Sequence, residues 1–170
     1  YINSKGKKII GWDEILDGGL APNATVMSWR GESGGIKAAQ MGHEVIMSPN
    51  ANLYFDHYQS KKDGEPVAIG GFTPIEEVYN YNPIPKELNE KYNKYIIGAQ
   101  ANVWTEYMKT SEHVEYMVFP RILALSEVLW SSNRTNFTEF KLRAKNYFKR
   151  LDKLDINYSK HLEKEEIKWY

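Results

Sequence analysis

The sequence predicts an α/β fold that forms the C-terminal half of a (β/α)8 barrel, with about four parallel strands and their helices. Three observations predict this fold. Four short segments are almost continuously apolar, as strands buried in a parallel sheet are. Helical patterns lie between or after these segments, as βα units require. Polar or aromatic residues directly follow the strands, where barrel proteins place their functional groups. The predicted strands cover residues 7–11, 25–29, 44–47 and 95–104.

The remaining segments predict helices and one long irregular stretch. A helix over 36–41 is expected to close at Gly42, because glycine favours the left-handed conformation of a helix end. A second helix over 74–81 has Thr73 as its expected N-cap. Helical periodicity also covers 111–130 and 137–154, and residues 50–72 are expected to be irregular. Pro120 predicts a kink in the first of these long helical stretches or a break into two helices.

A small doubly wound sheet is the structural alternative, but the chain has no glycine-rich sequence of the kind that binds nucleotides. The composition excludes several classes of partner. The 22 basic residues balance 22 acidic ones, so nucleic-acid binding is not expected. The chain has no cysteine, and no apolar run approaches the ~20 residues of a membrane span. The four histidines show no metal-ligand spacing, so we expect neither a metal nor a cofactor.

The ends of the predicted strands concentrate aromatic and acidic residues. Aromatic rings pack against the apolar C–H faces of sugars, and carboxylates accept hydrogen bonds from sugar hydroxyls, with about 1.5–3 kcal/mol for each charged hydrogen bond. This combination predicts a pocket for a pyranose ring, although packing in the core is the alternative for any single tryptophan. The candidate residues at or after the strand ends are Trp12, Asp13, Glu14, Trp29, Arg30, Tyr54, Asp56, Trp104 and Glu106.

Five motifs give the chain a specific resemblance to a known family. The motifs are GWDEIL (11–16), MSWRG (27–31), YFD (54–56), GAQANVWTEY (98–107) and FPRILALSEVLW (119–130). In their order and spacing they resemble the second half of the catalytic domain of glycoside hydrolase family 20, over roughly residues 5–155. The resemblance implies one catalytic part over residues 1–155, followed by a tail or linker over 156–170.

The resemblance implies a β-N-acetylhexosaminidase, which removes terminal non-reducing N-acetyl-D-hexosamine residues. Its mechanism is substrate-assisted and retaining: the acetamido oxygen of the sugar itself attacks the anomeric carbon. Carried over by position, Tyr54 is similar to the tyrosine that hydrogen-bonds the acetamido oxygen. Asp56 and Glu106 are similar to the carboxylates that hold the O4 and O6 hydroxyls. The pocket around the acetamido group and the sugar ring would be walled by Trp12, Trp29 and Trp104.

The family's catalytic Asp-Glu pair, which lies in a motif like H-x-G-G-D-E, does not occur in this sequence. Asp13-Glu14 is an adjacent pair, but its neighbours resemble the following strand of the barrel. We therefore expect it to cap the next helix or to pair with Arg30. Arg121 is expected to be structural and to pair with a carboxylate such as Glu127.

The expected partners follow from these assignments. They are an N-acetylhexosamine-containing glycan and the missing N-terminal half of the barrel, with a homodimer as another way to cover open sheet edges. Without the acid, the isolated chain is expected to be inactive. His57 is expected on the surface beside the pocket. The compartment is not fixed, although a secreted, periplasmic or lysosome-like parent protein is expected. Two other functions stay open: a non-catalytic N-acetylglucosamine-binding module, and a structural fragment whose aromatics are all core.

Overall fold

The computed structural model describes residues 1–164 and divides the chain into two compact units. The first unit comprises Tyr1–Leu53 and Asn82–Gln100, and the second comprises Tyr54–Tyr81 and Ala101–Tyr170. Residues 165–170, the end of the predicted charged tail, lie outside the described part. The first unit contains the sheet, and the second contains most of the helical residues.

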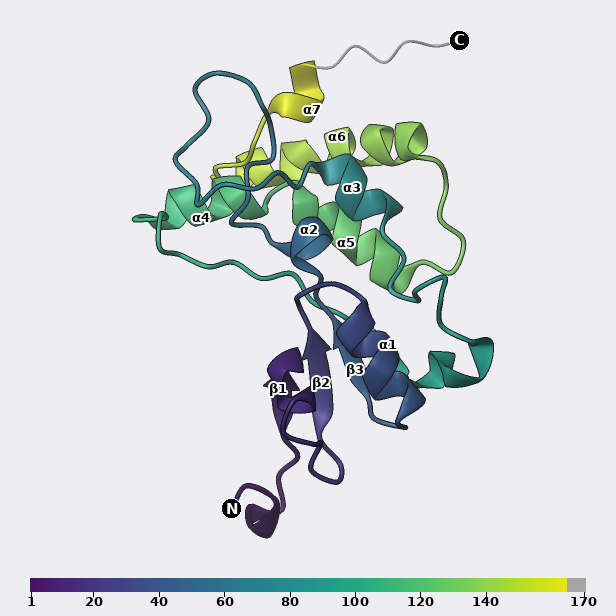
Figure 1. Cartoon of the computed structure of the whole chain (residues 1–170). Helices are drawn as coiled ribbons and strands as arrows, with labels where there is room; N and C mark the ends of the chain where they lie inside the picture. The colour runs from purple at the N-terminus through teal and green to yellow at the C-terminus, as the bar shows by residue number, and fades with distance from the viewer. Residues whose placement is uncertain (165–170) are drawn as a thin grey trace. The chain divides into compact units, whose positions relative to one another are not determined.

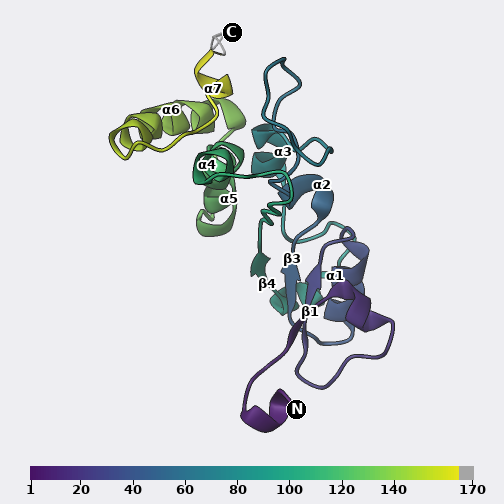
Figure 2. The same cartoon turned by 90° about the vertical axis from the view of Figure 1, so that its left-hand side faces the viewer.

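A four-stranded parallel sheet forms the centre of the first unit, which confirms the predicted strand number and direction. The strands are neighbours in chain order: β1 (Ile10–Trp12), β2 (Thr25–Ser28), β3 (Val45–Met47) and β4 (Ile96–Ala99). Figure 1 shows β1, β2 and β3 side by side, and Figure 2 shows β4 beside β3. Val26, Val45 and Met47 are fully buried, as strands of a covered parallel sheet require.

Short helices complete the first unit: η1 (Asn3–Lys5), η2 (Asp13–Leu16), α1 (Ser33–Gln40), α2 (Asn50–Leu53) and η3 (Glu90–Tyr95). Helix α1 packs against β2 and β3. It begins three residues before the predicted helix because Ser28 Oγ accepts a hydrogen bond from the Gly35 N–H in its first turn. Gly42 follows with a φ of 86°, in the left-handed conformation predicted for the helix end.

The second unit is a helical assembly of α3 (Ile75–Asn80), α4 (Ser111–Val118), α5 (Arg121–Trp130), α6 (Phe137–Lys153) and α7 (His161–Lys164). Helix α3 packs on α5 and α6, as Figure 1 shows, and α4 packs on α5. Of the kink or break predicted at Pro120, the structure shows the break, because α4 ends before it and α5 starts after it. Side chains of Thr110 and Asn136 cap α4 and α6 by accepting hydrogen bonds from backbone N–H groups.

Two local predictions differ from the structure. The fourth strand covers only residues 96–99 of the predicted 95–104. Tyr95 belongs to η3, and after Ala99 the strand-like pairing is limited to an isolated bridge of Asn102 with Tyr54. Thr73 does not cap α3: it is fully buried, and its Oγ1 lies 3.0 Å from His57 Nδ1 instead. The segment after α6 packs on that helix, since Tyr158 stacks on Phe148 with ring centroids 4.8 Å apart.

No helix in the part of the chain that the structure describes is long and apolar enough to cross a membrane.

Candidate functional site

Two predicted tryptophans meet at one edge of the sheet in the first unit. Trp12 ends β1 and Trp29 directly follows β2, and parallel strands place their carboxyl ends on the same side. Their ring centroids lie 6.5 Å apart with planes 82° apart, an edge-to-face contact. The backbone of Trp29 is also held, because its carbonyl accepts from the Asn50 N–H at 2.9 Å. Both rings are partly exposed, so they retain surface for a ligand.

Glu14 fixes the indole of Trp29. The Trp29 Nε1–H lies 3.0 Å from each oxygen of the exposed Glu14 carboxylate. This hydrogen bond is the main reason that the pKa of Glu14 lies below its ordinary value. A carboxyl group with a lowered pKa is ionised at neutral pH, so it is poorly suited to donate a proton to a leaving group.

Asp13 is a structural carboxylate. It is 1% exposed, and its Oδ2 accepts hydrogen bonds from the backbone N–H groups of Trp29 and Arg30. Its Oδ1 accepts from Arg30 Nε at 2.6 Å, which confirms the predicted pairing of these two residues. A Cβ added at Gly34 would lie 2.9 Å from Asp13 Cβ, so glycine at that position allows α1 to approach the carboxylate.

In the second unit, Tyr54 and Asp56 lie on a buried segment paired with the chain after β4. Tyr54 forms an isolated parallel bridge with Asn102, and the Phe55 N–H donates to the Asn102 carbonyl at 2.8 Å. Tyr54 is 8% exposed and Asp56 is 4% exposed. Asp56 Oδ1 is buried and has no hydrogen-bond partner among the described residues.

The electrostatics of Asp56 reflect this burial. Desolvation is the largest effect and raises the pKa of its carboxyl group above the ordinary value. The neighbouring charge of Glu106 raises this pKa further, whereas the charge of Arg121 lowers it. Asp56 and Glu106 thus belong to the same unit, and their role as the pair that binds sugar hydroxyls stays a prediction. Glu106 is exposed, and Trp104 nearby in the chain is 43% exposed.

Two residues near this segment differ from their predicted environments. Arg121 is structural as predicted, but its partner is not Glu127: it is fully buried and donates only to backbone carbonyls. Glu127 instead accepts hydrogen bonds from Arg143 and from the hydroxyl of Tyr79. His57, expected at the surface, is half-buried, and its burial lowers the pKa of the imidazole. The long side chain of Arg121 carries its guanidinium into the core of the unit. The hydrophobic periodicity of the sequence does not reveal that a cation is buried there.

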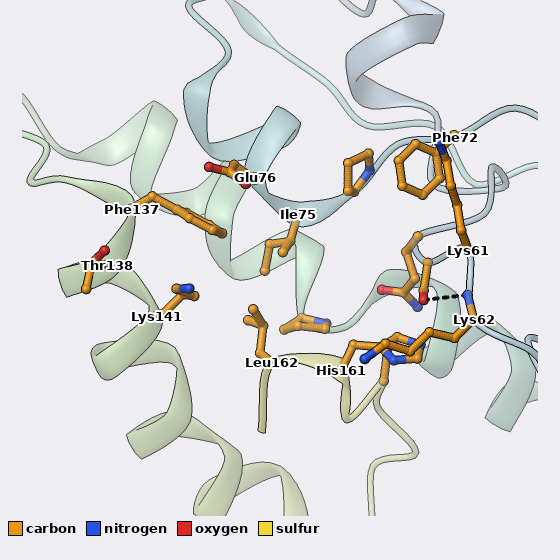
Figure 3. Close-up of a pocket in the computed structure, with 15 residues that line it drawn as sticks. Lys61, Lys62, Phe72, Ile75, Glu76, Phe137, Thr138, Lys141, His161 and Leu162 are labelled. Carbon is orange, nitrogen blue, oxygen red and sulfur yellow. Dashed lines mark hydrogen bonds between the residues drawn. The ribbon is translucent and has the colours of Figure 1, made fainter. Parts of the chain in front are cut away.

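The structure therefore collects the six predicted residues into two groups. Trp12 and Trp29 belong to the first unit, whereas Tyr54, Asp56, Trp104 and Glu106 belong to the second. A separate hollow of about 560 Å³ in the second unit contains none of them. Figure 3 shows Lys61 and Lys62 on one side of this hollow and Lys141 on the other. Among the residues whose side chains the structure describes, no group of three or more acidic or histidine side chains is placed to hold a metal ion.

The parallel strands, with aromatic and acidic residues at their carboxyl ends, define an α/β chain of the (β/α)8-barrel class. Residues 1–133 match the family model described as "Glycosyl hydrolase family 20, catalytic domain". The chain belongs to glycosyl hydrolase family 20. It is 55% identical over 159 residues, 92% of its length, to a beta-hexosaminidase of Porphyromonas gingivalis. It is 33% identical over 128 residues, 74% of its length, to a beta-hexosaminidase of Vibrio furnissii.

Solved structures agree with this assignment. The exo-β-N-acetylglucosaminidase of Vibrio harveyi, solved in complex with N-acetylglucosamine, matches 92% of the chain with a TM-score of 0.79 and 27% identity. The β-N-acetylhexosaminidase of Streptomyces coelicolor matches with a TM-score of 0.82 at 22% identity, which shows the shared fold. The chain covers 25% and 33% of these two structures. It likewise spans only 20% and 21% of the two curated relatives.

Proposed function

We propose that this chain is part of a β-N-acetylhexosaminidase and that it binds the terminal N-acetylhexosamine of a glycan or glycoconjugate. Family membership supports the reaction class. The observation that carries the site is the Asp56 carboxylate, which is 4% exposed with one buried oxygen lacking a partner among the described residues. Leaving a buried oxygen without a hydrogen bond is costly, so such an atom points to a ligand that completes it. A sugar hydroxyl supplies the required donor.

The remaining roles follow from side-chain chemistry and from the family resemblance. Asp56 and Glu106 accept hydrogen bonds from the O4 and O6 hydroxyls of the terminal sugar. Trp12, Trp29 and Trp104 offer partly exposed rings to the acetamido group and the sugar face, where apolar C–H groups pack. The Tyr54 hydroxyl donates a hydrogen bond to the acetamido carbonyl oxygen and so orients it toward the anomeric carbon.

The reaction proceeds in two displacements at that carbon. In the first, the acetamido oxygen forms a bond to the anomeric carbon while the glycosidic bond breaks, and a general acid protonates the leaving oxygen. The product is an oxazoline intermediate. In the second, the deprotonated general acid takes a proton from water as the water oxygen bonds to the anomeric carbon, the bond to the acetamido oxygen breaks, and the original configuration returns. The Tyr54 contact acts in both displacements because it holds the acetamido group at the reacting carbon.

We further propose that the general acid lies outside these 170 residues, on the part of the barrel with the family's Asp-Glu pair. The two candidates within the chain do not suit the role. Asp13 is engaged by three N–H groups of Trp29 and Arg30. The Glu14 carboxylate accepts the Trp29 indole N–H, which lowers its pKa. The isolated chain would then bind sugar but turn it over very slowly, since a general acid contributes about 10²–10⁴-fold.

The two edge strands of the sheet are open to pairing with further strands. Among the described residues, β1 pairs only with β2, and β4 pairs only with β3. Ile10 on β1 is 57% exposed and Ile97 on β4 is 54% exposed. Exposed apolar edge strands pair readily with other chain segments. We propose that the N-terminal half of the barrel covers these edges, and a homodimer of the isolated chain would be the competing arrangement.

The experiment that tests the proposed function measures p-nitrophenol release from p-nitrophenyl N-acetyl-β-glucosaminide by the full-length protein. Tyr54→Phe should lower kcat by about 10²-fold, as loss of a hydrogen bond to developing charge does. Glu106→Gln should lower kcat/KM by about tenfold or more. Tyr58→Phe is the matched control, because among the described residues the Tyr58 hydroxyl accepts a hydrogen bond from the Ala68 N–H in the neighbouring loop. Full activity of Tyr54→Phe would remove the proposed role of Tyr54.

A further inference from the structure

Arg121 is a buried cation whose hydrogen bonds all go to backbone. It begins α5, is 0% exposed, and forms no ion pair with a carboxylate within the described part of the chain. Its Nε donates to the Met117 carbonyl at 3.0 Å, and its Nη2 donates to the same carbonyl at 2.6 Å. A buried guanidinium has five N–H groups to satisfy, and here neutral carbonyls satisfy them.

Two further bonds of Arg121 lie on either side of Asp56 in the chain. Nη2 donates to the carbonyl of Phe55, the preceding residue, at 2.5 Å. Nη1 donates to the carbonyl of His57, the following residue, at 3.1 Å. The Arg121 Cζ atom also lies 4.7 Å from the centroid of the Phe55 ring, a cation–π contact. One planar group therefore fixes the backbone immediately before and immediately after the buried carboxylate.

Arg121 also connects the segment around Asp56 to a second irregular segment, which contains Thr73. Its Nη1 donates to the Thr73 carbonyl at 2.9 Å, and the Thr73 hydroxyl lies 3.0 Å from His57 Nδ1. A Cβ added at Gly71 would lie 2.6 Å from the His57 ring, so this packing leaves no room for movement of the imidazole toward residue 71. The guanidinium thus closes a rigid frame around Asp56, which is the arrangement that a preorganised binding group requires.

The charges of Arg121 and Asp56 also support each other. Burial lowers the pKa of Arg121 to about 9, and the Asp56 carboxylate is the largest charge opposing that change. Burial likewise raises the pKa of Asp56, and the Arg121 cation opposes it. Arg121 stays protonated at neutral pH and favours an ionised Asp56, the form that accepts hydrogen bonds on both oxygens.

We propose that Arg121 is a positioning residue for substrate binding: its grip on the carbonyls of Phe55 and His57 holds the Asp56 carboxylate where a sugar hydroxyl meets it. This inference rests on the proposed role of Asp56 in the hexosaminidase site. A lysine at this position retains the charge but cannot reach several carbonyls in the fixed plane of a guanidinium. The Arg121→Lys variant therefore separates the planar grip from the charge.

The test is a double-mutant cycle in the full-length protein, with kcat/KM measured on p-nitrophenyl N-acetyl-β-glucosaminide. Arg121→Lys should lower kcat/KM by about tenfold or more, close to the loss of one charged hydrogen bond. In the Asp56→Asn background, the same substitution should lower kcat/KM by less than about threefold, because the group it positions is already altered. The matched control is Arg143→Lys, since Arg143 contacts Glu127 and Thr135 rather than the Asp56 segment. Melting temperatures of all variants separate loss of fold from loss of positioning.

The outcomes distinguish this inference from the proposed function. Equal losses from Arg121→Lys in both backgrounds, with Asp56→Asn itself impaired, would overturn the positioning role and leave the hexosaminidase assignment standing. An Asp56→Asn variant as active as the wild type would overturn both the role of Asp56 and this inference. If Arg121→Lys does not fold, Phe55→Leu provides the same cycle, because it removes the ring under the guanidinium and keeps an apolar side chain. Additive losses with Phe55→Leu would then overturn the inference.

Discussion

The indole N–H of Trp29 lies 3.0 Å from both carboxylate oxygens of Glu14, so an exposed acid orients an aromatic ring of the predicted pocket. We expect Glu14→Gln in the full-length protein to raise KM several-fold, because the weaker neutral acceptor holds the ring less firmly. The value of kcat should change less than about threefold. Steady-state kinetics checks this prediction. A loss of kcat of about 10²-fold or more would instead identify Glu14 as a general acid.

Trp104 should matter for the ligand more than for the fold. Its side chain is 43% exposed, so Trp104→Ala should lower the free energy of unfolding by about 1 kcal/mol or less. The loss of a stacking surface should raise KM by tenfold or more. Trp130, 89% exposed in the same unit, provides the matched control, and Trp130→Ala should leave KM unchanged. A destabilisation of about 3–5 kcal/mol by Trp104→Ala would favour the alternative in which the tryptophan is core.

The ionised Asp56 carboxylate should lower the stability of the folded protein at neutral pH, although the same carboxylate is proposed to bind the sugar. Its pKa in the folded protein lies above the ordinary value of 3.8, chiefly because of burial. Ionisation is therefore harder in the folded state, and this cost develops as the pH rises from the ordinary value through the folded value. Asp56→Asn should raise the melting temperature at pH 7, and the gain should disappear below pH ~3.8. Thermal melts across this range test the sign, and a lower melting temperature at pH 7 would contradict it.

Gly34 should be required for the packing of α1 on Asp13. A Cβ there would lie 2.9 Å from Asp13 Cβ, so Gly34→Ala should destabilise the protein by about 1–3 kcal/mol through overpacking. Gly18→Ala is the matched control, because an added Cβ there meets no atom within 4 Å. Chemical denaturation of both variants measures the difference. Equal stability of the two variants would show that α1 adjusts without cost.

The strands and their parallel direction were predictable because strands buried in a parallel sheet are continuously apolar and are followed by polar residues. The same reasoning predicted a kink or break at Pro120, where the missing N–H prevents a continuous helix. Local capping was less predictable. Thr73 has a suitable sequence position, but tertiary packing places it in the core, where it contacts His57.

The residue types of the candidate site were predictable from the sequence. The contacts that hold these residues in place were less predictable. The pairing of Asp13 with Arg30 followed from their positions at neighbouring strand ends. The carbonyl partners of Arg121 did not, because Phe55, His57 and Thr73 are 66, 64 and 48 positions away in the chain. Backbone carbonyls carry no sequence signature. An arginine held by them looks the same in the sequence as one held by a carboxylate such as Glu127.

The central claim is that this chain supplies sugar-binding residues, including Tyr54, to a hydrolase whose acid lies elsewhere. The most direct measurement mixes this chain with the N-terminal half of the full-length protein, which carries the expected H-x-G-G-D-E motif, and follows p-nitrophenol release from p-nitrophenyl N-acetyl-β-glucosaminide. We expect turnover only in the mixture, with a loss of about 10²-fold on Tyr54→Phe. A mixture that is folded and associated but hydrolyses nothing, or turnover by this chain alone at the rate of the full-length protein, would contradict the account.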